Sequence, residues 1–377
     1  MPLTQVDQGL LSSTAQYTGF KNRIINGQMQ LDQRNAGASY AQVNAAYNLD
    51  RWIGYSYAGG AVTGKYTAQQ NAGSVTPPAG FTSYLGVTSS AATADASTNI
   101  YGIAQRIEGL NVSDLGWGTA NAKTVTLSFW VRSSLTGTFG GSIQNNAQDR
   151  SFPFSYTISA ANTWEQKSVI IAGDQSGTWL RTSSVGVLVN FGIGVGSTFS
   201  GTANAWAAAN YYSATSATSV VGTNGATWYL TGVQFEVGST ATSFDFRSIS
   251  TELALCQRYY EKSFDIGTAP AAGVSSQGSN YDMGTIAYSA SSARGPVQGF
   301  KVSKRTTPTM ILYAPAGYGG TSGNNPVIYI GGGWYNWTGY SAVAFGYGFW
   351  LDGSTPATVT NGNAYLMSGA WSANAEL

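Results

Sequence analysis

Thr124–Arg132 reads TVTLSFWVR, and this stretch decides the class of fold. Its alternate positions carry apolar residues, namely Val125, Leu127, Phe129 and Val131. Successive side chains of an extended strand point to opposite faces, so this period of two predicts a strand with one face in a core. Trp130 interrupts the polar face, where it either stacks on a ligand or packs under a loop or a second subunit.

Two further stretches predict long strands. In Val185–Gly196, VGVLVNFGIGVG, one phase is apolar and the other is mostly glycine. Such a glycine row indicates close approach of another sheet, another subunit or a flat ligand, or else a sharply curved strand. In Thr227–Val237, TWYLTGVQFEV, the apolar phase changes at Gly232, which predicts a β-bulge. Strands of this kind, separated by turn residues, predict a β-sandwich or jelly roll.

The composition agrees with an all-β protein. Charged residues make up 9% of the 377-residue chain, against roughly 25% in an ordinary soluble domain. There are 48 glycines and 13% aromatic residues, a mixture that favours turns and strands over helices. The net charge of +1 provides no electrostatic footprint, so no nucleic-acid partner is expected. No apolar run reaches the ~20 residues of a membrane span, so no membrane insertion is expected.

Histidine is absent, and Cys256 is the single cysteine. This excludes Ser-His and Cys-His nucleophile pairs, imidazole metal sites and an intrachain disulfide. No cofactor is expected. A metal held by carbonyls and Asp or Asn remains possible in a jelly roll, although no EF-hand-like loop occurs. The first residues lack a secretion signal, so synthesis in a cytoplasm is expected.

The chain divides into four predicted parts. Residues 1–21 form a polar arm, which is either a docking segment or a frayed terminus. Residues 22–247 form the jelly-roll β-sandwich, and residues 248–264 form one short connecting helix. Residues 265–377 form a second, smaller C-terminal β-domain.

The helix is predicted over Ser250–Lys262, STELALCQRYYEK, with Ser250 as its N-cap. Leu253, Cys256 and Tyr260 share one apolar face, so Cys256 is expected to be a buried thiol. An isolated helix of this length is marginal, so it must pack on something. It is either a clamp between the β-rich regions or a contact on an oligomer axis.

Several segments carry a resemblance to a known family. They are NRIINGQMQLDQRNAG (Asn22–Gly37), LDRWIGY (Leu49–Tyr55), NAGSVTPPAGFTSYLGVTSS (Asn71–Ser90), IAQRIEGLNVSDLGWGTANAKTVTLSFWVRSSLTGTF (Ile103–Phe139), TGVQFEVGSTATSFDFR (Thr231–Arg247) and the join TELALCQRYYEKSF (Thr251–Phe264). Together they resemble a module that recurs in bacteriophage tail fibres and related receptor-binding virion proteins. The C-terminal part after the join matches no named family.

The resemblance implies a jelly-roll β-sandwich similar to carbohydrate-binding modules, set in a fibre or spike. It implies a homotrimer on the tail or head of a virion, attached to another virion protein through residues 1–21. It provides no catalytic or sugar-contact residues for this chain.

The candidate ligand site lies in the ring-rich stretch Gly331–Trp350, GGGWYNWTGYSAVAFGYGFW. A sugar is held by flat rings against its C–H faces and by polar groups at its hydroxyls. The expected glycan contacts are Trp334, Tyr335, Asn336, Trp337, Tyr340 and Tyr318, which Tyr313 and Asn324 or Asn325 could join. A second set is instead expected in the core or at a subunit interface, namely Phe345, Tyr347, Phe349 and Trp350.

The expected function is therefore host adsorption by a non-enzymatic tail-fibre or tailspike-like protein that binds a cell-surface glycan, with the C-terminal β-domain, residues 265–377, as its receptor-binding tip. One alternative is a structural spike or decoration protein of the capsid, whose rings are buried between subunits. A second is a polysaccharide depolymerase, which would need two placed carboxylates. The chain has only 17 acidic residues, with no D-x-D or E-x-D spacing.

Overall fold

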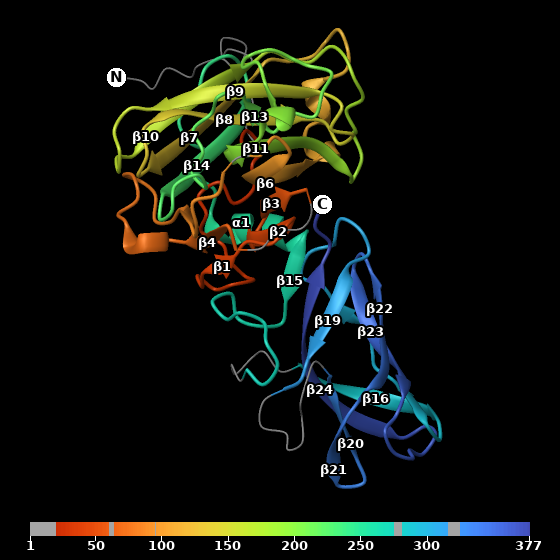
Figure 1. Cartoon of the computed structure of the whole chain (residues 1–377). Coiled ribbons are helices and arrows are strands. Elements are labelled where there is room, and N and C mark those ends of the chain that lie inside the picture. The colour runs from red at the N-terminus through yellow and green to blue at the C-terminus, as the bar shows by residue number, and fades with distance from the viewer. Residues whose placement is uncertain (1–19, 60–63, 95, 275–280, 316–324) are drawn as a thin grey trace, which may run out of the picture. The chain divides into compact units, whose positions relative to one another are not determined.

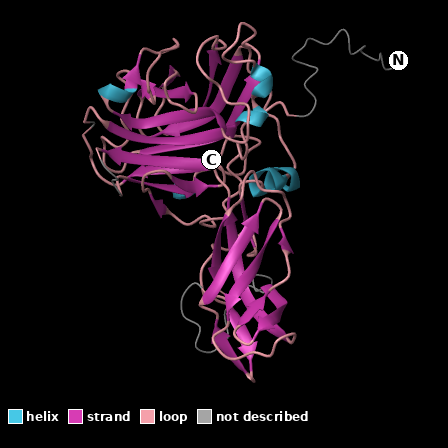
Figure 2. Cartoon of the chain, turned by 90° about the vertical axis from the view of Figure 1, so that its right-hand side faces the viewer, coloured by secondary structure: helices cyan, strands magenta, loops and turns pink. Residues whose placement is uncertain are grey.

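The computed structural model describes residues 20–59, 64–94, 96–274, 281–315 and 325–377 (Figure 1). Almost all of the predicted arm, residues 1–21, lies outside the described residues. The chain forms two compact units. One contains the chain up to Gln30, Ala38–Arg247 and Leu377, and the other contains Leu31–Gly37 and Ser248–Glu376. Strands dominate both units, so the predicted all-β class is confirmed (Figure 2).

The first unit is a jelly-roll β-sandwich of two antiparallel sheets. The first sheet contains, in spatial order, β1 (Tyr40–Ala41), β4 (Tyr66–Gln70), β5 (Leu85–Ser89), β14 (Thr227–Val237), β7 (Val125–Ser133) and β10 (Glu165–Ile171). The second contains β2 (Ala46–Leu49), β3 (Trp52–Ala58), β6 (Asn99–Glu108), β11 (Val185–Val195), β8 (Gly137–Gln144) and β9 (Ser151–Ile158). Neighbours such as β14–β5 and β11–β6 are distant in sequence, as the crossovers of a jelly roll require.

Smaller elements complete this unit. A parallel pair joins β12 (Ser200–Gly201) to β13 (Ser213–Ala214). Short 3-10 helices lie in the connections of the described residues, namely η2 (Ala72–Ser74), η3 (Gly109–Asn111), η4 (Ser113–Leu115) and η5 (Ser197–Phe199).

The core lies between the two sheets, where the strand β7 behaves as its pattern predicts. Its four alternate apolar side chains are fully buried in this core. Trp130, on the opposite face, is half-buried beside Gly232. A Cβ at position 232 would come within 3.0 Å of the Trp130 ring and 2.7 Å of Phe81, so Trp130 packs on its own chain.

The glycine row of β11 has a local explanation. Its apolar phase, including Val189 and Phe191, is buried in the core as predicted. On the other phase, a Cβ at Gly192 would lie 2.8 Å from Ser213 Oγ, and Gly140 of β8 faces the same hydroxyl. Ser213 belongs to β13, so the short β12–β13 sheet approaches the backbone at Gly192, whereas Gly186 faces Gly109 and Gly196 faces the Ala96 and Ser97 carbonyls.

The predicted bulge in β14 is confirmed. The pairing register between β14 and β7 shifts between Thr231 and Gln234, and Gly232 has a φ of 60°. This left-handed conformation favours glycine. Leu230 and Val233, which flank the bulge, are therefore both fully buried in spite of their opposite sequence phase.

The predicted helix is correct in place but wrong in extent. Helix α1 spans Ile249–Gln257, and its N-cap is Ser248, whose side chain accepts a hydrogen bond from the Thr251 amide, not Ser250 as expected. Cys256 is buried in the second unit, as predicted. The segment Tyr260–Lys262, predicted as helix, is instead strand β15 paired with β24. Pairing with a long strand outweighs the weak intrinsic preference of a short helix end.

The second unit is built around β24 (Ala364–Asn374), which pairs with four strands: β15, β16, β19 and β20. The other strands are β16 (Tyr281–Ser289), β17 (Ser292–Arg294), β18 (Gln298–Gly299), β19 (Thr309–Tyr313), β20 (Val327–Ile330), β21 (Gly333–Asn336), β22 (Gly339–Phe345) and β23 (Gly348–Ser354). They surround a separate hydrophobic core. The predicted second β-domain is thus present.

Leu31–Gly37 follows the first residues of the jelly roll in sequence but packs with the second unit. There Arg34 stacks on Tyr260 with its guanidinium 3.7 Å from the ring centroid. The Gln33 side chain donates to the Tyr260 carbonyl at 3.2 Å. A prediction that divides the chain once, at residue 247, cannot assign this earlier segment to the second unit.

Candidate functional site

The predicted ring cluster of the second unit is divided into two places. Gly331 and Gly332, with φ of 59° and 90°, form the tight turn between β20 and β21. This turn sets Trp334 opposite Tyr329, and the two rings lie 5.2 Å apart. Trp334 is half-buried, while Tyr335 is 43% exposed. Trp334 and Tyr335 are therefore accessible to a ligand in this unit.

Trp337 lies elsewhere, and its expected role as a glycan contact is corrected. Its side chain is fully buried in the core of the second unit. The indole N–H donates to the Ser354 carbonyl at 2.8 Å. A ring with no exposed surface cannot stack on a sugar, so Trp337 stabilises the fold.

The remaining predicted contacts are half-buried or lie outside the described residues. Tyr340 is half-buried with its ring 6.5 Å from that of Trp337, and burial raises the pKa of its phenol. Asn336 is half-buried. Tyr318 lies outside the described residues. Among the four rings expected in a core or interface, Phe349 is buried, whereas Tyr347 is 62% exposed.

A cavity that was not predicted from the sequence lies in the jelly roll. It has a volume of about 270 Å³ and opens between β3, β6 and three loops. Its lining consists of Asn44, Ala45, Tyr55, Tyr57, Ile100, Arg106, Gln148 and Tyr212. We call these eight residues the jelly-roll pocket. Three phenol rings, one guanidinium and two carboxamides provide both flat apolar faces and hydrogen-bonding groups.

Strand periodicity and loop contacts position the rings of the jelly-roll pocket. Tyr55 and Tyr57 are two residues apart on β3, so both face the same side of the sheet. Tyr212 comes from the segment next to β13 and packs edge-on against Tyr55 at 5.9 Å. Gln148 donates from its carboxamide to the Tyr212 hydroxyl at 2.9 Å. Tyr55 and Tyr212 therefore have fixed orientations.

Arg106 is held in place by two partners. One guanidinium nitrogen donates to the Tyr55 hydroxyl at 3.1 Å, and another donates to the Leu377 carbonyl. Guanidinium has five N–H groups, so further donors remain for a ligand. Because the side chain is pre-oriented, little conformational entropy is lost when those donors are used.

Two residues at the pocket carry a backbone conformation that is uncommon outside glycine. Ala45 has a φ of 53° and Gln148 has a φ of 57°. Left-handed non-glycine residues cost free energy and cluster at ligand-binding sites. Here they place the Asn44–Ala45 turn and the Gln148 carboxamide beside the tyrosines.

Arg106 is the one charged side chain among the eight lining residues. Burial and the neighbouring Tyr55 raise the pKa of Tyr212 to about 12, so its phenol stays uncharged at physiological pH. The eight lining residues include no carboxylate. The pocket can therefore donate and accept hydrogen bonds and stack rings, but its lining holds no pair of acids for glycoside cleavage.

The described residues contain no cluster of three or more His, Cys, Asp or Glu side chains that could hold a metal ion. Within the same residues, no helix has both the length and the apolar character needed to span a membrane.

Comparison with known proteins shows weak structural similarity only. No family model and no curated protein matches the chain. The enzymatically active domain of bacteriophage CBA120 tailspike protein 4 aligns at 12% identity with a TM-score of 0.29, covering 58% of this chain and 21% of that one.

Two further solved structures are carbohydrate-binding modules. A family 11 module from Clostridium thermocellum, in complex with a β-1,3-1,4-mixed-linked tetrasaccharide, aligns at 10% identity and a TM-score of 0.26 over 54% of this chain and 98% of that one. The CBM22 tandem of Paenibacillus barcinonensis Xyn10C aligns at 10% identity and a TM-score of 0.25 over 91% and 99%. Scores this low do not transfer any activity to this chain.

Proposed function

We propose that this protein is a bacteriophage virion protein of the tail-fibre or tailspike type, which binds a host surface glycan and does not cleave it. The observation that carries the glycan-binding part is the jelly-roll pocket. Its rings offer flat surfaces to the C–H faces of a sugar, and Arg106, Asn44 and Gln148 can pair with hydroxyls. The assignment to a phage particle follows from the sequence motifs alone.

The chemistry of the pocket favours recognition over catalysis. Trp and Tyr provide large rigid contact areas at low conformational cost. Glycoside hydrolysis usually needs two carboxylates about 5–10 Å apart, and the lining of the pocket has none. The assembly we propose is a homotrimer attached to another virion protein through residues 1–21.

Binding to a panel of immobilised bacterial surface polysaccharides tests the proposal. Tyr57→Ala removes a half-buried ring from the pocket, and we expect it to weaken binding at least tenfold, equivalent to about 1.4 kcal/mol. Tyr347→Ala removes an exposed ring of the other unit and should leave binding unchanged. Failure of the wild-type protein to bind any polysaccharide, or equal loss with both variants, would refute the assignment of this pocket.

Three controls test the remaining parts. Incubation with the bound polysaccharide should produce no new reducing ends, and their appearance would establish the depolymerase alternative. Light scattering should give three times 39.5 kDa, whereas a monomer at micromolar concentration would contradict the trimer. An antibody to the protein should label purified phage particles, and unlabelled particles would contradict the virion location.

A further inference from the structure

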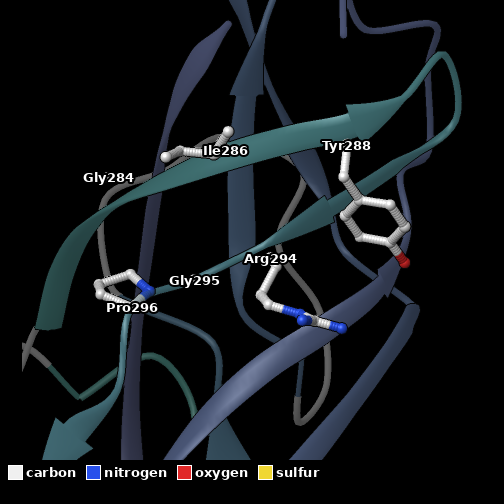
Figure 3. A pocket seen from close by; sticks show the side chains of 6 residues that line it. All are labelled: Gly284, Ile286, Tyr288, Arg294, Gly295 and Pro296. Carbon is white, nitrogen blue, oxygen red and sulfur yellow. The ribbon is translucent and has the colours of Figure 1, made fainter. Parts of the chain in front are cut away.

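The second unit contains a larger cavity, of about 490 Å³, on the outer face of its sheet. Gly284, Ile286, Tyr288, Arg294, Gly295 and Pro296 line it, along and just after the hairpin of β16 and β17 (Figure 3). We call these six residues the hairpin cavity. Its volume falls within the usual range for small-ligand sites.

Alternation along β16 creates the cavity. Met283, Thr285 and Ala287 point into the core and are buried, whereas Ile286 and Tyr288 are 59% and 51% exposed. Gly284 shares the exposed phase but has no side chain, and a Cβ there would meet nothing within 4 Å. The missing side chain leaves the open space beside Ile286.

Arg294 lines the cavity and forms an ion pair with Asp352 of β23, which is not one of the lining residues. Arg294 donates to a single Asp352 oxygen through Nε at 3.2 Å and Nη2 at 2.7 Å. The Tyr288 hydroxyl donates to the other Asp352 oxygen at 2.9 Å. The guanidinium carbon lies 5.6 Å from the centroid of the Tyr288 ring and 5.8 Å from that of Trp350.

This arrangement leaves polar groups for a ligand. The hydrogen bonds from Arg294 to Asp352 use Nε and Nη2. The third guanidinium nitrogen, Nη1, makes no hydrogen bond to a described residue, and the Arg294 side chain is 56% exposed. Partial burial raises the pKa of Asp352, but the hydrogen bonds from Arg294 and Tyr288 outweigh it and hold that pKa below its ordinary value. Asp352 is thus an ionised acceptor beside an unused donor.

We propose that the hairpin cavity binds a neutral pyranose ring, as a second saccharide subsite separate from the jelly-roll pocket. Adjacent sugar hydroxyls would pair with Arg294 Nη1 and the Asp352 carboxylate, while the C–H face lies on Tyr288 and Ile286. Asp352 already neutralises Arg294, so an anionic sugar gains little charge attraction. The choice of a saccharide rests on the proposed glycan-binding function.

Methyl NMR provides the test, because the Ile286 methyl groups report on the cavity itself. Methyl glycosides of glucose, galactose and mannose, titrated at millimolar concentration, should shift the Ile286 resonances of the full chain in at least one case. Methyl glucuronide should shift them no more than its neutral counterpart. Gly284→Val fills the open space without a clash, and it should abolish the shift.

Two further variants separate the explanations. Gly299→Val, at an exposed strand position with room for a Cβ, should leave the shift intact. Arg294→Gln should weaken the affinity for the glycoside, taken from the Ile286 titration, at least threefold. No shift with any neutral glycoside would overturn the proposal, as would a larger shift with the glucuronide. A change of oligomer mass in Gly284→Val would overturn it in favour of contact between copies of the chain.

The outcome is distinct from that of the proposed function. Loss of polysaccharide binding in Tyr57→Ala reports on the jelly-roll pocket, whereas the Ile286 shift reports on the hairpin cavity. Absence of the Ile286 shift together with a Tyr57-dependent polysaccharide interaction would remove only the second subsite.

Discussion

Replacing Trp337 by alanine should lower the free energy of unfolding of the second unit by several kcal/mol, and this loss should not depend on a ligand. The side chain is fully buried among Ile328, Leu351 and Met367 in the core of that unit. Truncation of a buried tryptophan costs about 3–5 kcal/mol through lost transfer free energy and the cavity left behind. Loss of the bond to the Ser354 carbonyl adds about 1 kcal/mol.

The conservative variant separates these two contributions. Trp337→Phe keeps most of the buried ring area but loses the N–H donor, so a cost of about 1–2 kcal/mol is expected. With a urea m-value of about 2 kcal/mol/M, the alanine variant should shift the unfolding midpoint down by about 2–3 M. The phenylalanine variant should shift it by less than half as much.

Hydrogen exchange at increasing urea concentration, followed by mass spectrometry, can assign the change to one unit. Amides of β24 should lose protection at lower urea in Trp337→Ala, while amides of β14 in the jelly roll keep theirs. If the urea midpoint of β24 falls by less than about 0.5 M, the core assignment is refuted, because removing a buried tryptophan side chain costs more free energy than that. Adsorption assays on this variant then report folding and not ligand contact.

Three other outcomes follow from the structure. Glu261→Gln removes the carboxylate that lies 2.5 Å from the fully buried Lys304 ammonium. Urea titration should show that the free energy of unfolding falls by about 3–5 kcal/mol, and a fall of less than about 1 kcal/mol would contradict this. Ser248→Ala removes the N-cap of α1 and should cost about 1 kcal/mol in the same assay, whereas no change would mean that the cap contributes nothing. Polysaccharide binding should be constant from pH 6 to 9, because the pKa of Tyr212 in the folded protein is about 12. The stability that the neutral Tyr212 phenol contributes is present below pH 10 and is lost as the pH rises from 10 through about 12. A titration step in binding near neutral pH would contradict this.

Strand patterns made much of the jelly roll predictable from sequence. The alternation in β7 and the phase change at Gly232 are local, because a strand imposes a period of two wherever one face is buried. The end of α1 was not predictable in this way. Tyr260–Lys262 joins a sheet through β24, which lies more than 100 residues away in the chain and leaves no trace in the local pattern.

The candidate sites were harder to predict for the same reason. Trp334 and Trp337 look alike in sequence, yet the first lies in a hairpin strand and the second in a core. The jelly-roll pocket combines β3 with Gln148 and Tyr212 from distant loops. Only the spacing of Tyr55 and Tyr57 gave a local signal, as two rings on one strand face.

The most direct test of the central claim is a crystal structure with the tightest-binding oligosaccharide from the polysaccharide panel. We predict a sugar ring in the jelly-roll pocket, in contact with Tyr57 and hydrogen-bonded to Arg106. Sugar density found only outside this pocket, with the Tyr57 side chain exposed to solvent, would contradict the account.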